Sequence, residues 1–251
     1  MYLCIVKKRY VNLIIDIGNT AAKLVAFDGN IPIDEVRTSN ETLEGLPDFI
    51  RKYPFDKGAI ASVYGITEQV NDHLNHLDFP LLHIDTDTPT PLINEYKTPK
   101  SLGIDRLAAA VGAYTEHPHH DLLVIDSGTC LTYEFVDKRG HYWGGCISPG
   151  LRMRLQSLHT FTAKLPCIEP EGDVPTIGYD TATAIRSGVI QGMKAEIEGR
   201  IRSFQEKHPS LLVFLTGGDT FDFDDKIKSI IFADKYIVPK GLNRILEYNN
   251  E

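Results

Sequence analysis

Apolar residues follow two spacings along this chain, and these spacings separate predicted strands from predicted helices. Short apolar runs bounded by glycine, asparagine or proline predict strands, whereas apolar residues three and four positions apart predict helices. In the first half the pattern predicts strands at 11–17, 21–27, 31–37, 58–63 and 79–84 and helices at 42–52, 67–77 and 103–114. The stretch 85–99 contains three prolines and is expected to be a loop.

The second half restarts with a similar order of elements. Its predicted strands lie at 122–126, at 131–136, in a run ending near Gly144-Gly145 and at 211–215, and its predicted helices begin after Pro149-Gly150 and span 181–204 and 241–248. In both halves strands alternate with helices after an antiparallel opening, which is typical of mixed α/β layers. Because an internal repeat near the midpoint favours two domains, we expect them at 1–117 and 118–251.

Two glycine turns, one near the start of each half, have nearly the same sequence. The first is Asp16-Ile17-Gly18-Asn19-Thr20 and the second is Asp126-Ser127-Gly128-Thr129, and each stands between two apolar runs. An ordinary hairpin turn would explain either one alone, but the repetition favours a shared function. A hairpin tip with a carboxylate, backbone N–H groups and a hydroxyl suits a phosphate. We therefore expect the two turns to face each other across a cleft that holds a nucleotide tail and its metal ion.

Three further segments could carry chemistry. In Gly103-Ile104-Asp105-Arg106 the acid is either a residue of a helix N-terminus or a general base beside an anion-binding arginine, and spacing alone leaves both readings open. Glycines in the segment 144–150 allow close approach of a ligand to the backbone. Gly217 and Gly218 follow a buried strand, where open α/β sheets bind ligands, so we expect them to contact the nucleotide.

Composition narrows the classes of function. The chain has 251 residues, of which 42% are hydrophobic, and its net charge of −8 argues against a nucleic-acid partner, which needs a basic face. No apolar run reaches the length of a transmembrane helix, so we expect no membrane partner. The four cysteines form no C-x-x-C pair, which indicates neither zinc nor disulfides and favours a cytoplasmic protein. His117, His119 and His120 are expected in an exposed loop and not at a metal ion.

The order of these motifs resembles type III pantothenate kinase over nearly the whole chain. The resemblance implies an α/β fold of two duplicated ribonuclease-H-like domains flanking a nucleotide cleft, similar to sugar kinases, actin and heat-shock ATPases. It implies ATP-dependent phosphorylation of pantothenate to 4′-phosphopantothenate, the first step of coenzyme A biosynthesis, by a cytoplasmic homodimer. Mg²⁺ and a monovalent cation, K⁺ or NH₄⁺, are the implied cofactors.

The resemblance also implies roles for individual residues. The implied ATP contacts are Asp16, Ile17, Gly18, Asn19, Thr20 and Lys23 and, in the second half, Thr129 beside Gly217 and Gly218. The implied pantothenate contacts are Tyr96, Gly103, Ile104, Asp105, Arg106 and Thr181, of which Thr181 acts across a dimer interface. Asp105 would accept the proton of the substrate hydroxyl, and Asp126 would bind the monovalent cation.

Three departures and two rival functions accompany the resemblance. The segment Met1 to Tyr10 is an extension, or an upstream start, of unknown role. Cys146 replaces the usual alanine, and Asp180 stands where asparagine is common. The extra charge of Asp180 near a carboxylate substrate weakens the role of Thr181. One rival is a non-catalytic accessory transcription regulator of the same family. The other is a phosphatase of the same superfamily, in which an acid would position water in place of a substrate alcohol.

Overall fold

The computed structural model describes residues 11–63, 65–219, 221, 223 and 225–251. The chain forms two compact units, each with its own mixed sheet. Of the described residues, unit 1 contains those from Val11 to Ile93, together with Lys97–Thr115 and Tyr236–Glu251. Unit 2 contains Asn94–Tyr96 and Glu116–Lys235.

Unit 1 is built on a five-stranded sheet in the order β3-β2-β1-β4-β5. Its strands are β1 (Val11–Ile17), β2 (Ala22–Asp28), β3 (Ile31–Thr38), β4 (Phe55–Ser62) and β5 (Leu81–His83). The first three strands are antiparallel neighbours, whereas β4 runs parallel to β1 and β5 runs parallel to β4. Consecutive short connections therefore build the antiparallel half, and helical crossovers build the parallel half.

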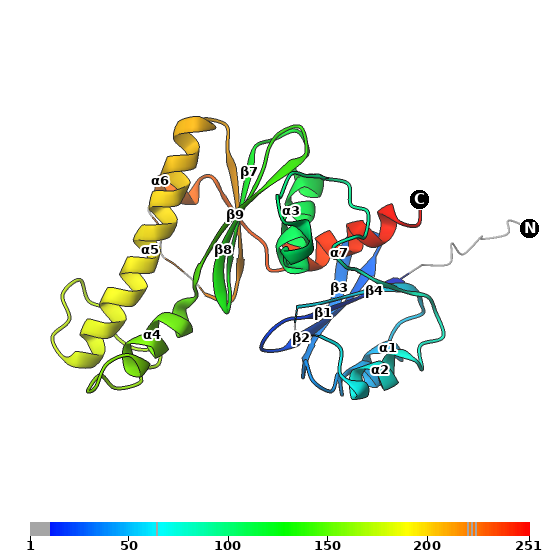
Figure 1. Cartoon of the computed structure of the whole chain (residues 1–251), viewed down its shortest axis with the longest axis horizontal. Helices are drawn as coiled ribbons and strands as arrows, with labels where there is room; N and C mark the ends of the chain where they lie inside the picture. The colour runs from blue at the N-terminus through cyan, green and yellow to red at the C-terminus, as the bar shows by residue number, and fades with distance from the viewer. Residues whose placement is uncertain (1–10, 64, 220, 222, 224) are drawn as a thin grey trace, which may run out of the picture. The chain divides into compact units, whose positions relative to one another are not determined.

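Helices lie against the sheet of unit 1 (Figure 1). Helices α1 (Leu46–Ile50) and α2 (Glu68–Leu74) place Phe49 and Val70 in a core with alternate residues of β1 such as Leu13 and Ile15. The other helices of the unit are α3 (Ile104–Glu116) and α7 (Ile237–Tyr248), and a 3₁₀ turn, η1 (Pro99–Ser101), precedes α3. Burial of these apolar side chains is the main force that holds the layers together.

Within unit 1, a glycine of α3 and a polar network hold α7 against α3 and the sheet. A Cβ at Gly112 would lie 2.1 Å from the Ile237 carbonyl oxygen, so α3 and α7 approach more closely than side chains allow. Asn12 of β1 donates to Asn243 Oδ1 at 2.8 Å and to Glu247 Oε1 at 2.6 Å. Lys57 of β4 completes the network through a 2.9 Å ion pair with Glu247. Because these polar groups satisfy one another, they fix the position of α7 on the sheet.

Unit 2 is built on a six-stranded sheet in the order β11-β10-β7-β8-β9-β6. Its strands are β6 (Ile93–Asn94), β7 (Leu122–Ser127), β8 (Cys130–Val136), β9 (His141–Pro149), β10 (Leu212–Gly217) and β11 (Ile231–Ala233). Its helices are α4 (Leu151–Thr160), α5 (Thr181–Lys207) and α6 (Asp225–Lys228). Buried side chains of α4 and α5, such as Leu155 and Met193, share one core with Leu123 and Tyr133 of the sheet.

Several sequence-based boundaries differ from the structure. The last helix begins at Ile237 and not at 241, because Pro239 is tolerated in a first turn whose N–H groups need no partner. That helix belongs to unit 1, whereas the expected boundary at 117 and 118 placed it in the second domain. Strand β9 continues to Pro149, beyond the expected end near Gly144-Gly145.

Four short elements were not predicted. They are β6, η1, α6 and β11, none longer than four residues. Such short segments carry too few positions for a periodic signal, and β6 lies in the stretch expected to be a loop. The Met1 to Tyr10 extension lies outside the described residues. Among the described residues, no helix combines the length and apolar character needed to cross a membrane.

Candidate functional site

The first glycine turn joins β1 to β2 and is held from behind by an asparagine. Inside the turn, the Gly18 N–H donates to the Ala21 carbonyl oxygen at 3.1 Å. Asn40 Nδ2 donates to the carbonyl oxygens of Gly18 and Asn19 at 3.1 and 3.0 Å. The turn therefore has a fixed backbone, while Asn19 and Thr20 stay exposed at its tip and Ile17 is buried at its base.

Asp16, at the end of β1, is the strongly perturbed carboxyl group of this turn. Burial raises its pKa to about 6, although the positive charge of Lys23 acts in the opposite direction and the negative charge of Asp105 adds to the increase. Lys23 is the cross-strand neighbour of Asp16 in the β1–β2 register. Unit 1 thus brings Asp105 near the hairpin pair Asp16 and Lys23, from which it is remote in sequence. Perturbed carboxyl groups of this kind mark functional sites.

Asp105 stands in the first turn of α3. Its Oδ1 accepts the Arg106 N–H at 2.9 Å, and a Cβ at Gly103 would lie 2.4 Å from that same oxygen. Glycine at 103 therefore leaves room for the carboxylate. Ile104 and Arg106 are buried on either side of the partly exposed Asp105.

The second glycine turn joins β7 to β8 in unit 2 and is backed by the loop after β10. Ser127 Oγ donates to Asp219 Oδ2 at 2.8 Å, and the Gly218 N–H donates to the Ser127 carbonyl oxygen at 2.9 Å. Gly217 has a φ of +101°, and a Cβ there would lie 2.1 Å from the Ser127 carbonyl oxygen. Only glycine can adopt this backbone at such close contact.

The exposed tip of this second turn contains Gly128 and Thr129, and Asp126 lies partly buried at its base. The Gly128 N–H donates to the Cys130 carbonyl oxygen at 3.0 Å, which resembles the internal bond of the first turn. Asp126, Thr129 and the Gly217-Gly218 loop are therefore neighbours at one end of the unit 2 sheet. Because parallel β7 and β10 both end there, their loops meet at the edge where α/β sheets bind ligands.

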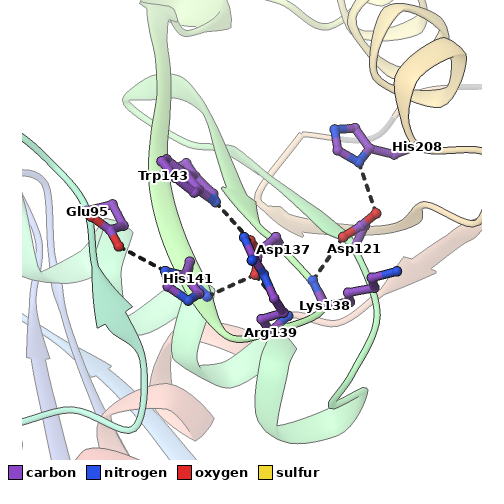
Figure 2. A network of polar contacts seen from close by, with 8 residues as sticks. All are labelled: Glu95, Asp121, Asp137, Lys138, Arg139, His141, Trp143 and His208. Carbon is purple, nitrogen blue, oxygen red and sulfur yellow. Dashed lines mark hydrogen bonds and ion pairs between the residues drawn. The ribbon is translucent and has the colours of Figure 1, made fainter.

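The short segment that carries Tyr96 packs against β9. The Glu95 N–H donates to the Tyr142 carbonyl oxygen at 2.9 Å, and Glu95 Oε1 contacts His141 Nδ1 at 2.9 Å (Figure 2). The Tyr96 ring occupies the space above Gly144, where a Cβ would approach the ring to 2.6 Å. Gly144 also has a φ of +93°, so both the close ring contact and the backbone conformation require glycine at this position.

A compact polar network supports the turn before β9 (Figure 2). Burial opposes ionisation of Asp137, but hydrogen bonds from the His141 and Arg139 amides and from Trp143 Nε1 outweigh it and lower the pKa of Asp137 to about 2. Each acceptor position of this carboxylate is thus used by the fold itself. We read this network as structural support for the segment that carries Tyr96.

Thr181 is the exposed first residue of α5, in unit 2, whereas Gly103 to Arg106 belong to unit 1. The neighbouring Asp180 is the N-cap of α5, and its Oδ1 accepts the Thr183 N–H at 2.8 Å. Hydrogen bonds from the Thr183 amide and hydroxyl lower the pKa of Asp180. Aspartate and asparagine cap helices equally well, which accounts physically for the departure at this position.

Two weaker sequence candidates have structural roles. His117 packs on Phe232 with ring centroids 4.8 Å apart, and no group of three acidic, histidine or cysteine side chains suited to a metal occurs in the described part of the chain. Cys146 is partly buried against the unit 2 core. Asn40 is the site residue that sequence reasoning missed. A lone asparagine after a strand has no pattern that would distinguish it from a turn residue.

Comparisons with known proteins agree on one family. The sequence profile of the type III pantothenate kinases matches residues 12–203. Type III pantothenate kinase of Bacteroides fragilis is 54% identical over 239 residues, which span 95% of this chain and 98% of the relative. The enzyme of the same description from Phocaeicola vulgatus is 52% identical over 240 residues, which span 96% of this chain and 99% of the relative.

Solved structures support the predicted fold class. A candidate Baf family transcriptional activator from Campylobacter jejuni has a TM-score of 0.59 at 21% identity, covering 95% of this chain and 98% of its own. A candidate N-acetylmannosamine kinase from Listeria monocytogenes has a TM-score of 0.53 at 12% identity, covering 96% and 100%. At these identities the likeness concerns the fold alone. It confirms the expected fold class, an α/β protein with two mixed sheets.

Proposed function

Because the chain belongs to the type III pantothenate kinase family, we propose that it phosphorylates the primary hydroxyl of pantothenate with Asp105 as the general base. The family makes the protein a kinase of coenzyme A biosynthesis that uses ATP. The proposed step forms a bond between the pantothenate oxygen and the γ-phosphorus of ATP and breaks the bond from that phosphorus to the bridging oxygen of ADP. Asp105 takes the hydroxyl proton.

The cluster of Asp16, Lys23 and Asp105 in unit 1 is the observation that carries this proposal. Phosphoryl transfer requires positioning and neutralisation of charge on the transferred group. Lys23 supplies a positive charge beside Asp16, and Asp105 is a second carboxylate close enough to raise the pKa of Asp16. A phosphate group and a hydroxyl brought to this cluster would therefore meet a cation and a base together.

The proposed ATP contacts come from both glycine turns. Asp16 to Lys23 would bind phosphate groups through turn amides, the Thr20 hydroxyl and the Lys23 ammonium group, with Thr129 and the Gly217-Gly218 loop as the contacts of unit 2. Mg²⁺ in kinases is held by one or two carboxylates together with phosphate oxygens and water. Asp16 fits that donor set, and the bound ion would neutralise charge on the phosphates.

The pantothenate site and the remaining cofactors rest on family roles and local structure. Tyr96, Gly103, Ile104, Arg106 and Thr181 would contact pantothenate, with Arg106 near its carboxylate or hydroxyl groups and Thr181 acting from a second copy of the chain. A homodimer is supported by large exposed apolar side chains of unit 2, of which Phe161 is 84% and Ile177 is 83% exposed. Asp126 would bind the monovalent cation.

The test is a direct assay of product formation. Purified protein is incubated with MgATP, pantothenate and K⁺, and 4′-phosphopantothenate is followed by mass spectrometry. Absence of product with K⁺ and with NH₄⁺ would contradict the proposal. Phosphate release from ATP without pantothenate would favour a phosphatase, and sequence-specific DNA binding at physiological salt would favour a regulator.

A further inference from the structure

Arg154 of α4 connects three elements of unit 2 behind the second glycine turn. Its Nε donates to the Pro149 carbonyl oxygen at 2.7 Å, and its guanidinium donates to Ser148 Oγ at 2.9 Å. The same guanidinium contacts Glu196 Oε2 of α5 at 2.5 Å. Only a fifth of the Arg154 side chain is exposed, so the bonds to Ser148 and Glu196 are partly shielded from water, whereas the bond to Pro149 is exposed.

The backbone that Arg154 holds lies directly against the turn. A Cβ at Gly150 would be 2.3 Å from the Gly128 carbonyl oxygen and 2.4 Å from the Thr129 carbonyl oxygen. Pro149 and Gly150 therefore form the floor under Gly128 and Thr129. Because the buried Gly150 leaves no room for even a Cβ against these two carbonyl groups, a displacement of this floor would displace the turn.

Glu196 anchors the guanidinium from the other side. Burial raises the pKa of Glu196, but the hydrogen bonds from Arg154 and Ser148 and the charge of Arg154 outweigh burial and lower it. Tyr133 of β8 donates its hydroxyl hydrogen to Glu196 Oε1 at 3.2 Å. A rigid chain of contacts thus runs from α5 through Arg154 to the floor of the turn.

We infer that Arg154, oriented by Glu196, is a positioning residue that sets the Thr129 turn for ATP. The inference rests on the proposed function, in which this turn contacts the phosphates. Arg154 acts on the backbone beneath the turn and is assigned no contact with ATP. Its planar guanidinium donates hydrogen bonds to Pro149, Ser148 and Glu196 at the same time. A lysine ammonium group cannot reproduce this arrangement.

The test separates ATP from pantothenate. Arg154→Lys retains a charge for Glu196 but loses the planar guanidinium, and we expect the Kd for MgATP, measured by calorimetry, and the KM for ATP to rise about five-fold, which corresponds to one lost hydrogen bond. The KM for pantothenate should stay within two-fold. Glu196→Gln should change ATP binding in the same direction. Arg202→Lys, in an exposed pair with Glu198 on α5, is the matched control and should behave as wild type.

Each outcome of this test decides between alternatives. Unchanged ATP affinity in a folded Arg154→Lys protein, or equal losses of ATP and pantothenate affinity, would overturn the inference. Urea unfolding identifies a variant that has lost its fold, and Glu196→Gln then provides the same comparison. If the wild-type protein binds MgATP but forms no 4′-phosphopantothenate, the proposed function fails, and calorimetry still tests the positioning role.

Discussion

Lys23 is the direct cross-strand partner of Asp16 in the β1–β2 hairpin, so the two side chains leave the same face of the sheet. Their opposite charges partly offset the burial and the Asp105 repulsion that together raise the pKa of Asp16 to about 6. Lys23 therefore limits the rise in the pKa of this partly buried carboxyl group.

The first prediction concerns pH. The pKa of Asp16 is raised by folding, so between its ordinary value and about 6 the folded state binds more protons than the unfolded state. The free energy of unfolding should therefore fall as pH rises through this window. Asp16→Asn should equal or exceed wild type in urea unfolding at pH 8, while MgATP binding weakens at least ten-fold.

The same pKa predicts that wild-type protein loses affinity for MgATP as pH falls below about 6, because a protonated Asp16 is a poor ligand for Mg²⁺. Asp48→Asn on the exposed face of α1 is the control and should change neither property. A variant at Asp16 that binds MgATP normally would contradict the role of this carboxylate.

The second prediction tests the base. Asp105→Asn preserves an acceptor for the Arg106 N–H and should leave the start of α3 intact. We expect kcat to fall by about a factor of a thousand, within the range of general-base contributions. The Kd for MgATP should stay within two-fold.

An independent readout accompanies that variant. Removing the Asp105 charge should lower the pKa of Asp16, so the pH dependence of MgATP binding should shift to more acidic values. Turnover near the wild-type rate would remove Asp105 from the role of base. An unchanged pH dependence would mean that the two carboxylates are not coupled in solution.

The third prediction concerns Asn40, which holds the first turn. Asn40→Ala removes the two hydrogen bonds to the Gly18 and Asn19 carbonyl oxygens. We expect a loss of about 1–2 kcal/mol in the free energy of unfolding, measured in urea, and a several-fold higher KM for ATP. Ser39→Ala, which removes one exposed bond to the Glu41 N–H, is the control and should leave the KM unchanged.

The fourth prediction concerns Gly144 and Tyr96. Gly144→Ala places a methyl group 2.6 Å from the Tyr96 ring on a backbone with positive φ, so the ring must move. The KM for pantothenate should rise at least five-fold, while MgATP binding stays near wild type. Gly199→Ala on α5 meets nothing within 4 Å and should raise stability by about 0.5–1 kcal/mol without a change in either KM. If the KM for pantothenate were the same in Gly144→Ala as in Gly199→Ala, Tyr96 would not be part of the pantothenate site.

Local pattern was sufficient for the elements that carry the motifs. The strands around Asp16 and Asp126 and the helix that begins near Asp105 were predicted within one or two residues, because each depends on its own apolar spacing and turn chemistry. The two glycine turns were recognisable for the same reason. Their internal hydrogen bonds join residues only two or three positions apart.

Long-range packing decided what the sequence did not. The last helix belongs to unit 1 because its residues Asn243 and Glu247 bond to strand residues of that unit, Asn12 and Lys57. The amino-acid sequence of the helix does not identify these partners. Asn40 and Arg154 are likewise ordinary residues until the fold places a backbone carbonyl group beside them, that of a turn residue for Asn40 and that of Pro149 for Arg154.

The sequence by itself determined the family, the hairpins and the chemical types at their tips, since these are properties of neighbouring residues. Only the tertiary structure decided that Asp105 lies near enough to Asp16 to raise its pKa, and that Arg154 and Glu196 support the floor of the second turn. The physical reason is that charge coupling and burial depend on distance in space, and distances between remote segments are set when the cores pack.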